Sequence, residues 1–349
     1  MTARTLASQD STVCVGSALT RQRFDWLRRP DLASEAMYTR RDYFGILTAN
    51  ILLAEYVCQE RWRNRVMKRI FIGLGAVLGL LVVVATALPT ILHAAGLHPV
   101  YEGPSVALPG KRALIITTSH SVLAAPGETE GPETGVMASE FTHPYYTFID
   151  NGMSVDMASI RGGQIPIDPQ TLGYPVSTPE DERYLNDSIA QTKARNSLAI
   201  ADVDISQYDI VFISGGWGAA YDLAQSPVMA VKVSEAYYGE RTAVIGGVCH
   251  GVLGLVNAKD QEGNTLIAGR RMTGVTDKQI KELGIEMTPL HPETELRKAG
   301  AVFESQTAFR DVFATHVVID DEQRFVTGQN QNSGLETAHR MMQVIADRG

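Results

Sequence analysis

The feature that most constrains this fold is a glycine-rich turn around one cysteine, Gly247-Val248-Cys249-His250-Gly251. The apolar, β-branched run 241–246 before it is typical of a buried strand, and residues 252–258 after it can open as a helix. A strand, a sharp turn and a helix, with small residues two positions on either side of the central one, form a nucleophile elbow. The pattern therefore predicts that Cys249 is a nucleophile rather than a buried structural cysteine.

The elbow also predicts the state of the sulfur. The turn imposes strained backbone angles on Cys249, and its glycine neighbours leave room for them. At the N-terminus of a helix the dipole and the free N–H groups favour a thiolate, so we expect the pKa of Cys249 to lie below about 8.5. The other two cysteines, Cys14 and Cys58, lie far from it in the sequence, and three scattered cysteines make no disulfide framework.

Residues 70–92 form an apolar run without a charged residue, long enough to cross a hydrocarbon core of about 30 Å as a helix. The basic cluster 61–69 precedes the run, so the positive-inside rule predicts a single-pass protein of the cell membrane. Its N-terminus would be cytoplasmic, and the catalytic domain would lie on the outer side. A secretory signal starting at Met67 and cleaved near 85–87 is the alternative, with residues 1–66 as an upstream extension. The length of the run favours an uncleaved anchor.

Charge and composition divide the chain into four parts. These are a basic arm (1–69), a transmembrane helix or signal anchor (70–97), a linker (98–111) and a catalytic domain (112–349). The arm has 12 Lys/Arg and 7 Asp/Glu, a net +5, and the whole chain is −8, which leaves −13 for the rest. An acidic globular domain argues against nucleic acid as a partner.

Predicted strands and helices alternate through the last part. The strands are expected at 113–118, 154–159, 209–214, 241–246, 315–320 and 325–328, and the main helices at 136–151, broken at Pro144, and 333–346. Apolar, non-alternating strands separated by helices predict an α/β fold with a mostly parallel sheet and helices on both faces. Active sites of such sheets lie at the carboxyl ends of the strands. Cys249, Gly215-Gly216 and the loop before Glu140 all follow strands, so they are expected to converge there.

Further motifs run in a recognisable order: Ser139-Glu140, Asn151-Gly152, Gly162-Gly163, the run 215–223, Cys249-His250-Gly251, Met272-Thr273-Gly274 and the run 327–330. Together they resemble the DJ/PfpI superfamily, with its flavodoxin-like, class I glutamine amidotransferase-like fold. Within it they resemble the glyoxalase III and Hsp-type chaperone branch. The resemblance covers residues 112–348.

The resemblance implies a role for each candidate residue. Cys249 would attack an aldehyde carbon as a thiolate, and His250 would shuttle a proton between the two carbons of a ketoaldehyde. Glu140 would hydrogen-bond the sulfur. The backbone N–H groups of Gly216 and His250 are expected to form an oxyanion hole, in a pocket lined by Gly215, Gly216 and Trp217.

Two positions depart from the family pattern. Trp217 stands where glyoxalase-type members usually carry histidine. The acid that orients the catalytic histidine is expected after the Thr-Gly pair, but Lys278 and Ile280 stand where carboxylates are common. Asp277 is the nearest substitute, and Glu282 is the next.

The resemblance thus implies a membrane-anchored lyase of the glutathione-independent glyoxalase type, which converts a 2-oxoaldehyde to a 2-hydroxy acid. It implies a small carbonyl substrate and no cofactor, and it leaves a homodimer open. His120, His143 and His291 lack short ligand spacing, so no metal site is expected. The alternatives are a cysteine hydrolase (amidase, peptidase or deglycase), or a chaperone or redox-stress sensor in which the same cysteine becomes oxidised.

Overall fold

The computed structural model describes residues 36–94 and 96–348. Most of the predicted basic arm, with Cys14, lies outside the described residues. Contacts between Cα atoms divide the chain into two units, Met1–Leu88 and Pro89–Gly349. The predicted anchor and the predicted catalytic domain therefore belong to different units, apart from the end of the anchor.

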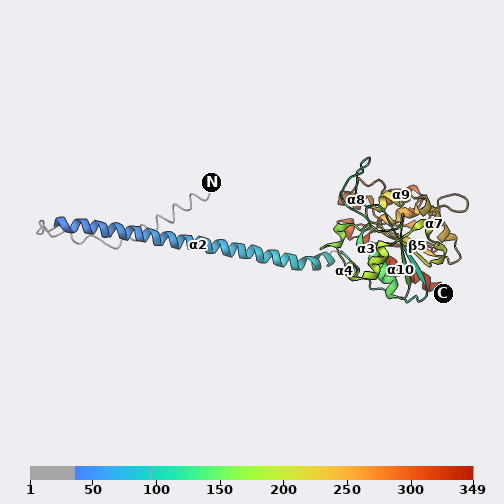
Figure 1. Ribbon diagram of the computed structural model, residues 1–349, viewed down its shortest axis with the longest axis horizontal. Helices are drawn as coiled ribbons and strands as arrows, with labels where there is room; N and C mark the ends of the chain where they lie inside the picture. The colour runs from blue at the N-terminus through green and yellow to red at the C-terminus, as the bar shows by residue number, and fades with distance from the viewer. Residues whose placement is uncertain (1–35, 95, 349) are drawn as a thin grey trace. The chain divides into compact units, whose positions relative to one another are not determined.

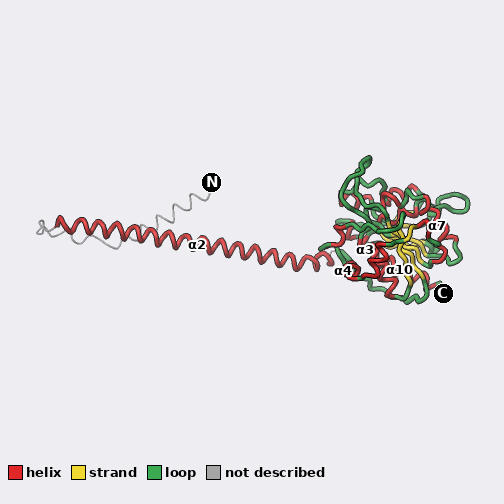
Figure 2. The backbone as a smooth tube through the Cα atoms, in the orientation of Figure 1, coloured by secondary structure: helices red, strands yellow, loops and turns green. Residues whose placement is uncertain are grey.

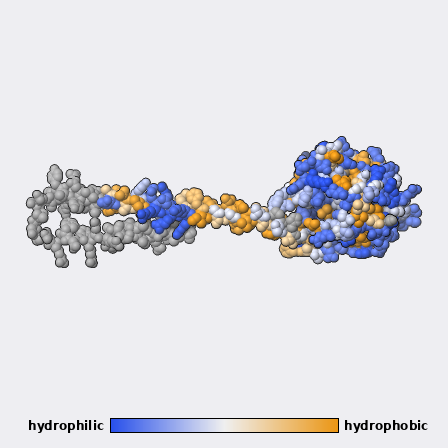
Figure 3. All heavy atoms as spheres, turned by 90° about the horizontal axis from the view of Figure 1, so that it is seen from below, coloured by the Kyte–Doolittle hydropathy of each residue, from blue (hydrophilic) through white to orange (hydrophobic). Residues whose placement is uncertain are grey.

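A single helix, α2 (Ala36–Ala94), contains the predicted apolar run. Its segment Thr48–Leu88 is long and apolar enough to cross a membrane, and none of its most apolar window is buried in the protein. Figure 3 shows a band of polar residues on this helix between two apolar stretches. The hydroxyl of Thr86 donates to the carbonyl of Val82 at 2.9 Å, so this polar side chain within the run is satisfied inside its own helix.

The second unit is built on a seven-stranded sheet in the order β3-β2-β1-β4-β5-β9-β8. All neighbouring strands are parallel except β8 and β9, which pair antiparallel. The strands are β1 (Arg112–Thr117), β2 (Ser154–Ser159), β3 (Leu198–Ala199), β4 (Ile210–Ile213), β5 (Val244–Val248), β8 (Val317–Ile319) and β9 (Phe325–Gly328). A separate parallel pair joins β6 (Arg271–Met272) to β7 (Val302–Phe303). The predicted mostly parallel sheet is thus confirmed.

Helices cover both faces of this sheet, as Figures 1 and 2 show around the bundle of strands. The α-helices are α3 (Ala138–Asp150), α4 (Pro179–Asn186), α5 (Ser188–Arg195), α6 (Ala219–Asp222), α7 (Pro227–Tyr238), α8 (Asp277–Leu283), α9 (Pro292–Lys298) and α10 (Gly334–Asp347). The 3₁₀ helices are η1 (Pro169–Leu172), η2 (Ile200–Asp202), η3 (Ile205–Gln207), η4 (Cys249–Leu255), η5 (Asp311–Phe313) and η6 (Gln331–Ser333).

Strand β1 shows why its sequence does not alternate between polar and apolar residues. Ala113 and Ile115 are buried in one apolar cluster with α3 and α10, whereas Leu114 and Ile116 are buried in a second cluster with α7. Successive side chains of a strand point to opposite faces, so a strand covered on both sides needs apolar residues at every position.

Two predicted elements differ in extent. The strand expected at 241–246 starts only at Val244, because Thr242 has a φ of 49° and belongs to the preceding turn. The segment 98–111, expected as a linker, belongs to the second unit and is hydrogen-bonded within it. The His98 N–H donates to Asn332 Oδ1 at 2.9 Å, and the ring of Tyr101 stacks on His339 with centroids 4.0 Å apart.

Candidate active site

Cys249 occupies a sharp turn between β5 and η4, with a φ of 56°. This left-handed conformation costs a non-glycine residue roughly 1–3 kcal/mol, so the surrounding structure must enforce it. Gly247 and Gly251 do so by close packing: a Cβ at either position would collide with the carbonyl group of Ile213 on β4. The predicted strand–turn–helix elbow is therefore present, although its helix is 3₁₀ rather than α.

The sulfur of Cys249 is almost enclosed, since the residue is 3% exposed. The groups close enough to change the pKa of this sulfur are the backbone N–H groups of His250 and Gly216 and the carboxyl of Glu140. The ring Nδ1 of His250 lies 3.4 Å from Sγ. The structure thus brings Cys249, His250, Glu140 and Gly216, four of the predicted site residues, to one point at the carboxyl end of the sheet.

Gly215 and Gly216 follow β4 and wrap around this point. Gly216 has a φ of 92°, and a Cβ there would overlap the backbone of residues 135–137, so only glycine fits. At Gly215 a Cβ would lie 2.6 Å from Glu140 Oε2 and 2.7 Å from the His250 nitrogen. The glycine pair lets two strand ends and α3 meet without side chains between them.

Glu140 is fully buried on α3, with Oε2 accepting the N–H of Gly215 at 2.9 Å. Oε1 makes no hydrogen bond of ordinary geometry, and the carboxyl faces the Cys249 thiol at longer range. Burial raises the pKa of Glu140 to about 8, against the smaller lowering effects of Cys249 and Gly215. At neutral pH this carboxyl therefore keeps its proton.

The helix break predicted at Pro144 is wrong, because α3 runs without interruption through it. A proline within a helix cannot donate to the carbonyl four residues earlier, which here is that of Glu140. The hydroxyl of Ser214, at the end of β4, supplies the missing hydrogen bond and donates to the Glu140 carbonyl at 2.9 Å. Pro144 thus leaves the Glu140 carbonyl without a donor in the helix. The hydrogen bond from Ser214 to this carbonyl then ties the backbone of Glu140 to the end of β4.

The lowered pKa predicted for Cys249 is also wrong. Burial raises the pKa of this thiol well above its usual value, and the charge of an ionised Glu140 raises it further, while the N–H groups of His250 and Gly216 lower it. Desolvation disfavours any charged form in an enclosed site, and here it outweighs the effect of the helix dipole. When Glu140 is protonated its charge is absent, so the neutral carboxyl no longer opposes a thiolate.

His250 is fully buried beside the sulfur, and Trp217 packs edge-on against its ring with centroids 5.5 Å apart. Burial, followed by the charge of His291, lowers the pKa of His250 to about 3. The imidazole is therefore neutral at physiological pH. Its Nε2 has no hydrogen-bond partner among the described residues.

Asp277, predicted as the orienting acid, is not brought to His250. It is exposed at the first position of α8, where its carboxylate accepts the Thr294 hydroxyl at 2.7 Å and its N–H donates to Glu293. A carboxylate is stabilised at a helix N-terminus, which explains this position. Glu282 is engaged as well, since it accepts the N–H of Asp311 at 2.8 Å.

Two residues near the site were missed as functional candidates. Ser214 is only the last residue of a predicted strand in the sequence. The available signal was Pro144, which removes the helical donor to the Glu140 carbonyl and so indicates that another donor is needed. His291 was considered only as a metal ligand. It is the residue directly before α9, and no spacing rule connects it with His250.

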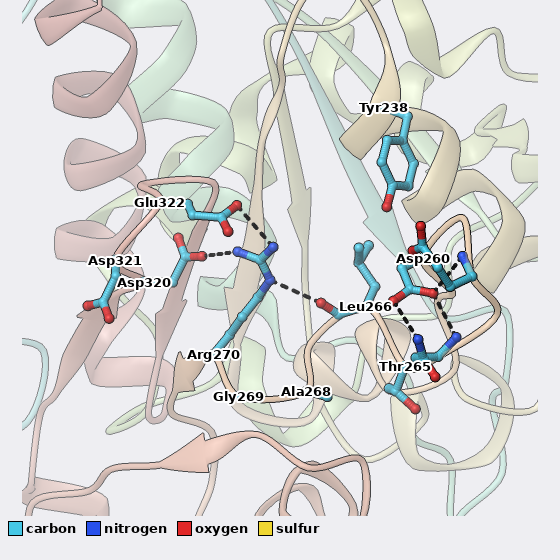
Figure 4. A pocket seen from close by; sticks show the side chains of 12 residues that line it. Tyr238, Asp260, Thr265, Leu266, Ala268, Gly269, Arg270, Asp320, Asp321 and Glu322 are labelled. Atoms are coloured by element: carbon cyan, nitrogen blue, oxygen red, sulfur yellow. Dashed lines mark hydrogen bonds and ion pairs between the residues drawn. The ribbon is translucent and has the colours of Figure 1, made fainter.

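A surface hollow of about 600 Å³ lies elsewhere in the domain, around Arg270 (Figure 4). Arg270 is paired with Asp320 at 2.6 Å and with Glu322 at 3.0 Å, and Asp260 accepts N–H groups of its own loop. None of the predicted site residues lines this hollow. Its size does not make it the active site, because its one arginine is already paired with carboxylates of the fold.

Comparison with known proteins adds independent information. A model of the DJ-1/PfpI family matches residues 133–343, all of them beyond α2. Glyoxalase 3 of Candida albicans is 27% identical over 221 residues, which cover 60% of this chain and 89% of that protein. The glutathione-independent glyoxalase HSP31 of Saccharomyces cerevisiae is 27% identical over 250 residues, covering 67% of this chain and 98% of that protein.

Solved structures agree with these relatives. Rapid encystment protein 24 kDa of Francisella tularensis is 32% identical with a TM-score of 0.61, covering 67% of this chain and 99% of its own. Glyoxalase III of Candida albicans is 26% identical with a TM-score of 0.60, covering 67% and 97% respectively. Both similarities extend over nearly the whole length of the matched protein.

Proposed function

Because this chain belongs to the DJ-1/PfpI family, we propose that it is a cysteine-dependent glyoxalase that turns a 2-oxoaldehyde and water into a 2-hydroxy acid. The observation that carries the proposal is the surroundings of the Cys249 sulfur. It faces a protonated carboxyl, two backbone N–H groups and a neutral imidazole 3.4 Å away. The 3% exposure of Cys249 favours a small substrate such as methylglyoxal.

The first step is attack of the Cys249 sulfur on the aldehyde carbon. As the S–C bond forms, the thiol proton moves to Nδ1 of His250 and the carbonyl oxygen becomes an alkoxide. The N–H groups of Gly216 and His250, which face the sulfur in the free enzyme, are close enough to stabilise that oxygen. Transfer of the proton from His250 to the oxygen completes a hemithioacetal and restores the neutral imidazole.

The second step moves a hydrogen within the bound substrate. His250 removes the proton from the former aldehyde carbon and delivers it to the neighbouring ketone carbon, while the hemithioacetal hydroxyl gives up its own proton to the ketone oxygen. The first carbon is thereby oxidised to a thioester and the second is reduced to an alcohol, so no external oxidant is needed. Water then cleaves the thioester, releasing the 2-hydroxy acid and the Cys249 thiol.

A protonated Glu140 has a defined part in this scheme. Its O–H can hydrogen-bond the sulfur when negative charge is present there, as the thiol loses its proton before attack and again when the thioester is cleaved. Because the pKa of Glu140 is about 8, this donor is present at neutral pH and is lost as the pH rises above about 8.

Product analysis tests the proposed function. Full-length protein in detergent is incubated with methylglyoxal, and lactate is measured for the wild type and Cys249→Ala. We expect lactate from the wild type and a loss of at least about 10³-fold in the variant, because removing a nucleophile removes the covalent route. Wild-type protein that forms no lactate, but hydrolyses amides or glycated peptides, would instead support a hydrolase.

We also propose that α2 anchors this enzyme in the cell membrane, with the N-terminus cytoplasmic and the catalytic domain on the outer side. Support comes from its apolar segment, which is not buried in the protein, and from the basic residues 61–69 on one flank. A reporter that is active only outside the cytoplasm, fused after Gly349, should be active. A reporter active only in the cytoplasm would contradict this topology.

A further inference from the structure

Two buried ring nitrogens beside the elbow have no hydrogen-bond partner among the described residues. One is Nε2 of His250 and the other is Nε2 of His291. His250 is fully buried, and its other nitrogen, Nδ1, is the one that faces the Cys249 sulfur. Buried polar atoms are nearly always paired, so two unpaired nitrogens in one region point to a shared function.

His291 approaches the elbow from a different part of the chain. It precedes α9, and its side chain makes no capping hydrogen bond to that helix. Helix α9 packs against η4, which carries Cys249 and His250. The contact is close at Gly274, where a Cβ would lie 3.3 Å from Pro292 Cβ and 3.4 Å from the Cys249 carbonyl oxygen. The residue before Pro292 is therefore held next to the active site by packing.

The two histidines also interact electrostatically. After burial, the charge of His291 is the next cause that lowers the pKa of His250. The other titratable groups at this point are the Cys249 thiol, which contacts His250, and the Glu140 carboxyl behind it. No carboxylate among the described residues hydrogen-bonds His250, so the position of the orienting acid is open to another acceptor.

We propose that His291 is a positioning residue for His250: its Nε2 accepts the Nε2–H of His250 through one bridging water molecule. With the ring proton held on Nε2, the lone pair of Nδ1 stays directed at the Cys249 thiol and can take its proton. A ring-nitrogen acceptor, unlike a carboxylate, fixes this tautomer without adding negative charge. The inference rests on the proposed function only in giving His250 the role of proton acceptor.

The chemistry of triads sets the size of the effect. Loss of tautomer control in a serine protease triad costs about 10⁴-fold in kcat. A neutral acceptor stabilises the imidazolium less than a carboxylate does, so we expect a smaller loss here, about 10- to 100-fold.

The experiment compares three substitutions at His291 in the full-length protein in detergent. His291→Leu removes the acceptor, His291→Gln keeps an acceptor oxygen at similar reach, and His291→Glu introduces a carboxylate. His316→Leu is the matched control, because His316 is also partly buried but has no described contact with His250. The readouts are the ¹⁵N shifts of the His250 ring, thermal stability and methylglyoxal turnover against pH.

We expect the wild type and His291→Gln to hold His250 as the Nε2–H tautomer, with turnover within about threefold of each other. His291→Leu should shift the ring toward the Nδ1–H tautomer and lower kcat by about 10- to 100-fold, with little change in KM. His291→Glu should move the acidic limb of the pH profile upward by about one unit, because a nearby negative charge raises the pKa of His250.

An unchanged His250 tautomer in His291→Leu would overturn the inference, even if turnover or stability fell. So would an equal tautomer shift in His316→Leu. Wild-type protein without methylglyoxal turnover would instead count against the proposed function. The tautomer measurement needs no substrate, so the two failures are distinguishable.

Discussion

The two sides of the Cys249 sulfur are built in different ways. On the Glu140 side two hydrogen bonds tie the residue to the end of β4: the Ser214 hydroxyl donates to the Glu140 carbonyl, and the Gly215 N–H donates to Oε2. On the His250 side the inner nitrogen faces the sulfur, but the outer nitrogen has no partner among the described residues. One side is fixed by direct hydrogen bonds, and the other by packing and a neighbouring histidine.

This difference predicts which side of the site tolerates amino-acid substitutions better. A residue that is hydrogen-bonded through both its backbone and its side chain leaves little freedom, because each lost bond exposes a buried polar group. The histidine side depends on a ring tautomer, which several neighbouring groups can influence. We therefore expect substitutions on the Glu140 side to have the larger effects, and substitutions of the predicted acids near α8 to have almost none.

Glu140→Gln should produce the largest effect of those considered next. Loss of the carboxyl proton donor should lower turnover at pH 7 by about 10- to 100-fold. Wild-type turnover should itself fall as the pH rises through about 8, where Glu140 loses its proton. The pH dependence of kcat checks both statements, and a variant with an unchanged profile would contradict the role of Glu140.

The same substitution tests stability. Below pH 4.5 the folded and unfolded chains both hold the Glu140 proton, and between 4.5 and about 8 only the folded chain does. Stability from this group therefore falls by about 1.4 kcal/mol per pH unit across that window and is fully lost above it. In thermal unfolding, the stability of Glu140→Gln relative to the wild type should rise from pH 5 to pH 8. The relative stability of the control Glu336→Gln, on partly exposed α10, should not change with pH.

Ser214→Ala should have the next largest effect. It leaves the Glu140 carbonyl, freed by Pro144, without a donor in a buried place, which costs about 1–3 kcal/mol. Because the carbonyl positions the carboxyl, turnover should fall about tenfold at constant KM. Ser159→Ala is the control: this buried serine pairs with Ser197, so its loss should lower the melting temperature and leave turnover unchanged.

These effects show which parts of the site the sequence can predict. The elbow, the glycine pair and Glu140 are local patterns, and a parallel sheet brings strand ends together at one edge. The continuity of α3 through Pro144 depends on Ser214, 74 residues from Glu140 in sequence, so the local rule for proline failed there. The raised pKa of Cys249 results from enclosure by several elements, which no local pattern reports.

The same reasoning applies to the rest of the fold. Strands such as β1 and β2 were predicted within one residue because their apolar runs are unbroken. The two-residue strands β3, β6 and β7 carry too few residues for any periodicity and were not predicted.

Trp217→His should have a smaller effect, in the opposite direction. The Trp217 ring packs edge-on against His250, so replacing it opens space and adds a polar group near the substrate. We expect methylglyoxal turnover to rise about threefold, with Trp217→Phe close to the wild type, since only the first variant restores a polar side chain. A fall in turnover with both variants would show that the indole supports His250 and is not merely a rim residue.

Asp277→Asn should have the smallest effect, less than about twofold on turnover, since substitutions on the surface away from the chemistry are usually nearly neutral. The Asp277 carboxylate is bonded to Thr294 on the exposed end of α8, and the structure gives it no contact with His250. Glu282→Gln serves as the companion variant, because Glu282 bonds the backbone of Asp311 and should affect stability alone. A tenfold loss in Asp277→Asn would mean that α8 moves and supplies the missing acid during turnover. A carboxyl group would then act on each side of the sulfur during turnover, and His291 would not be the residue that positions His250.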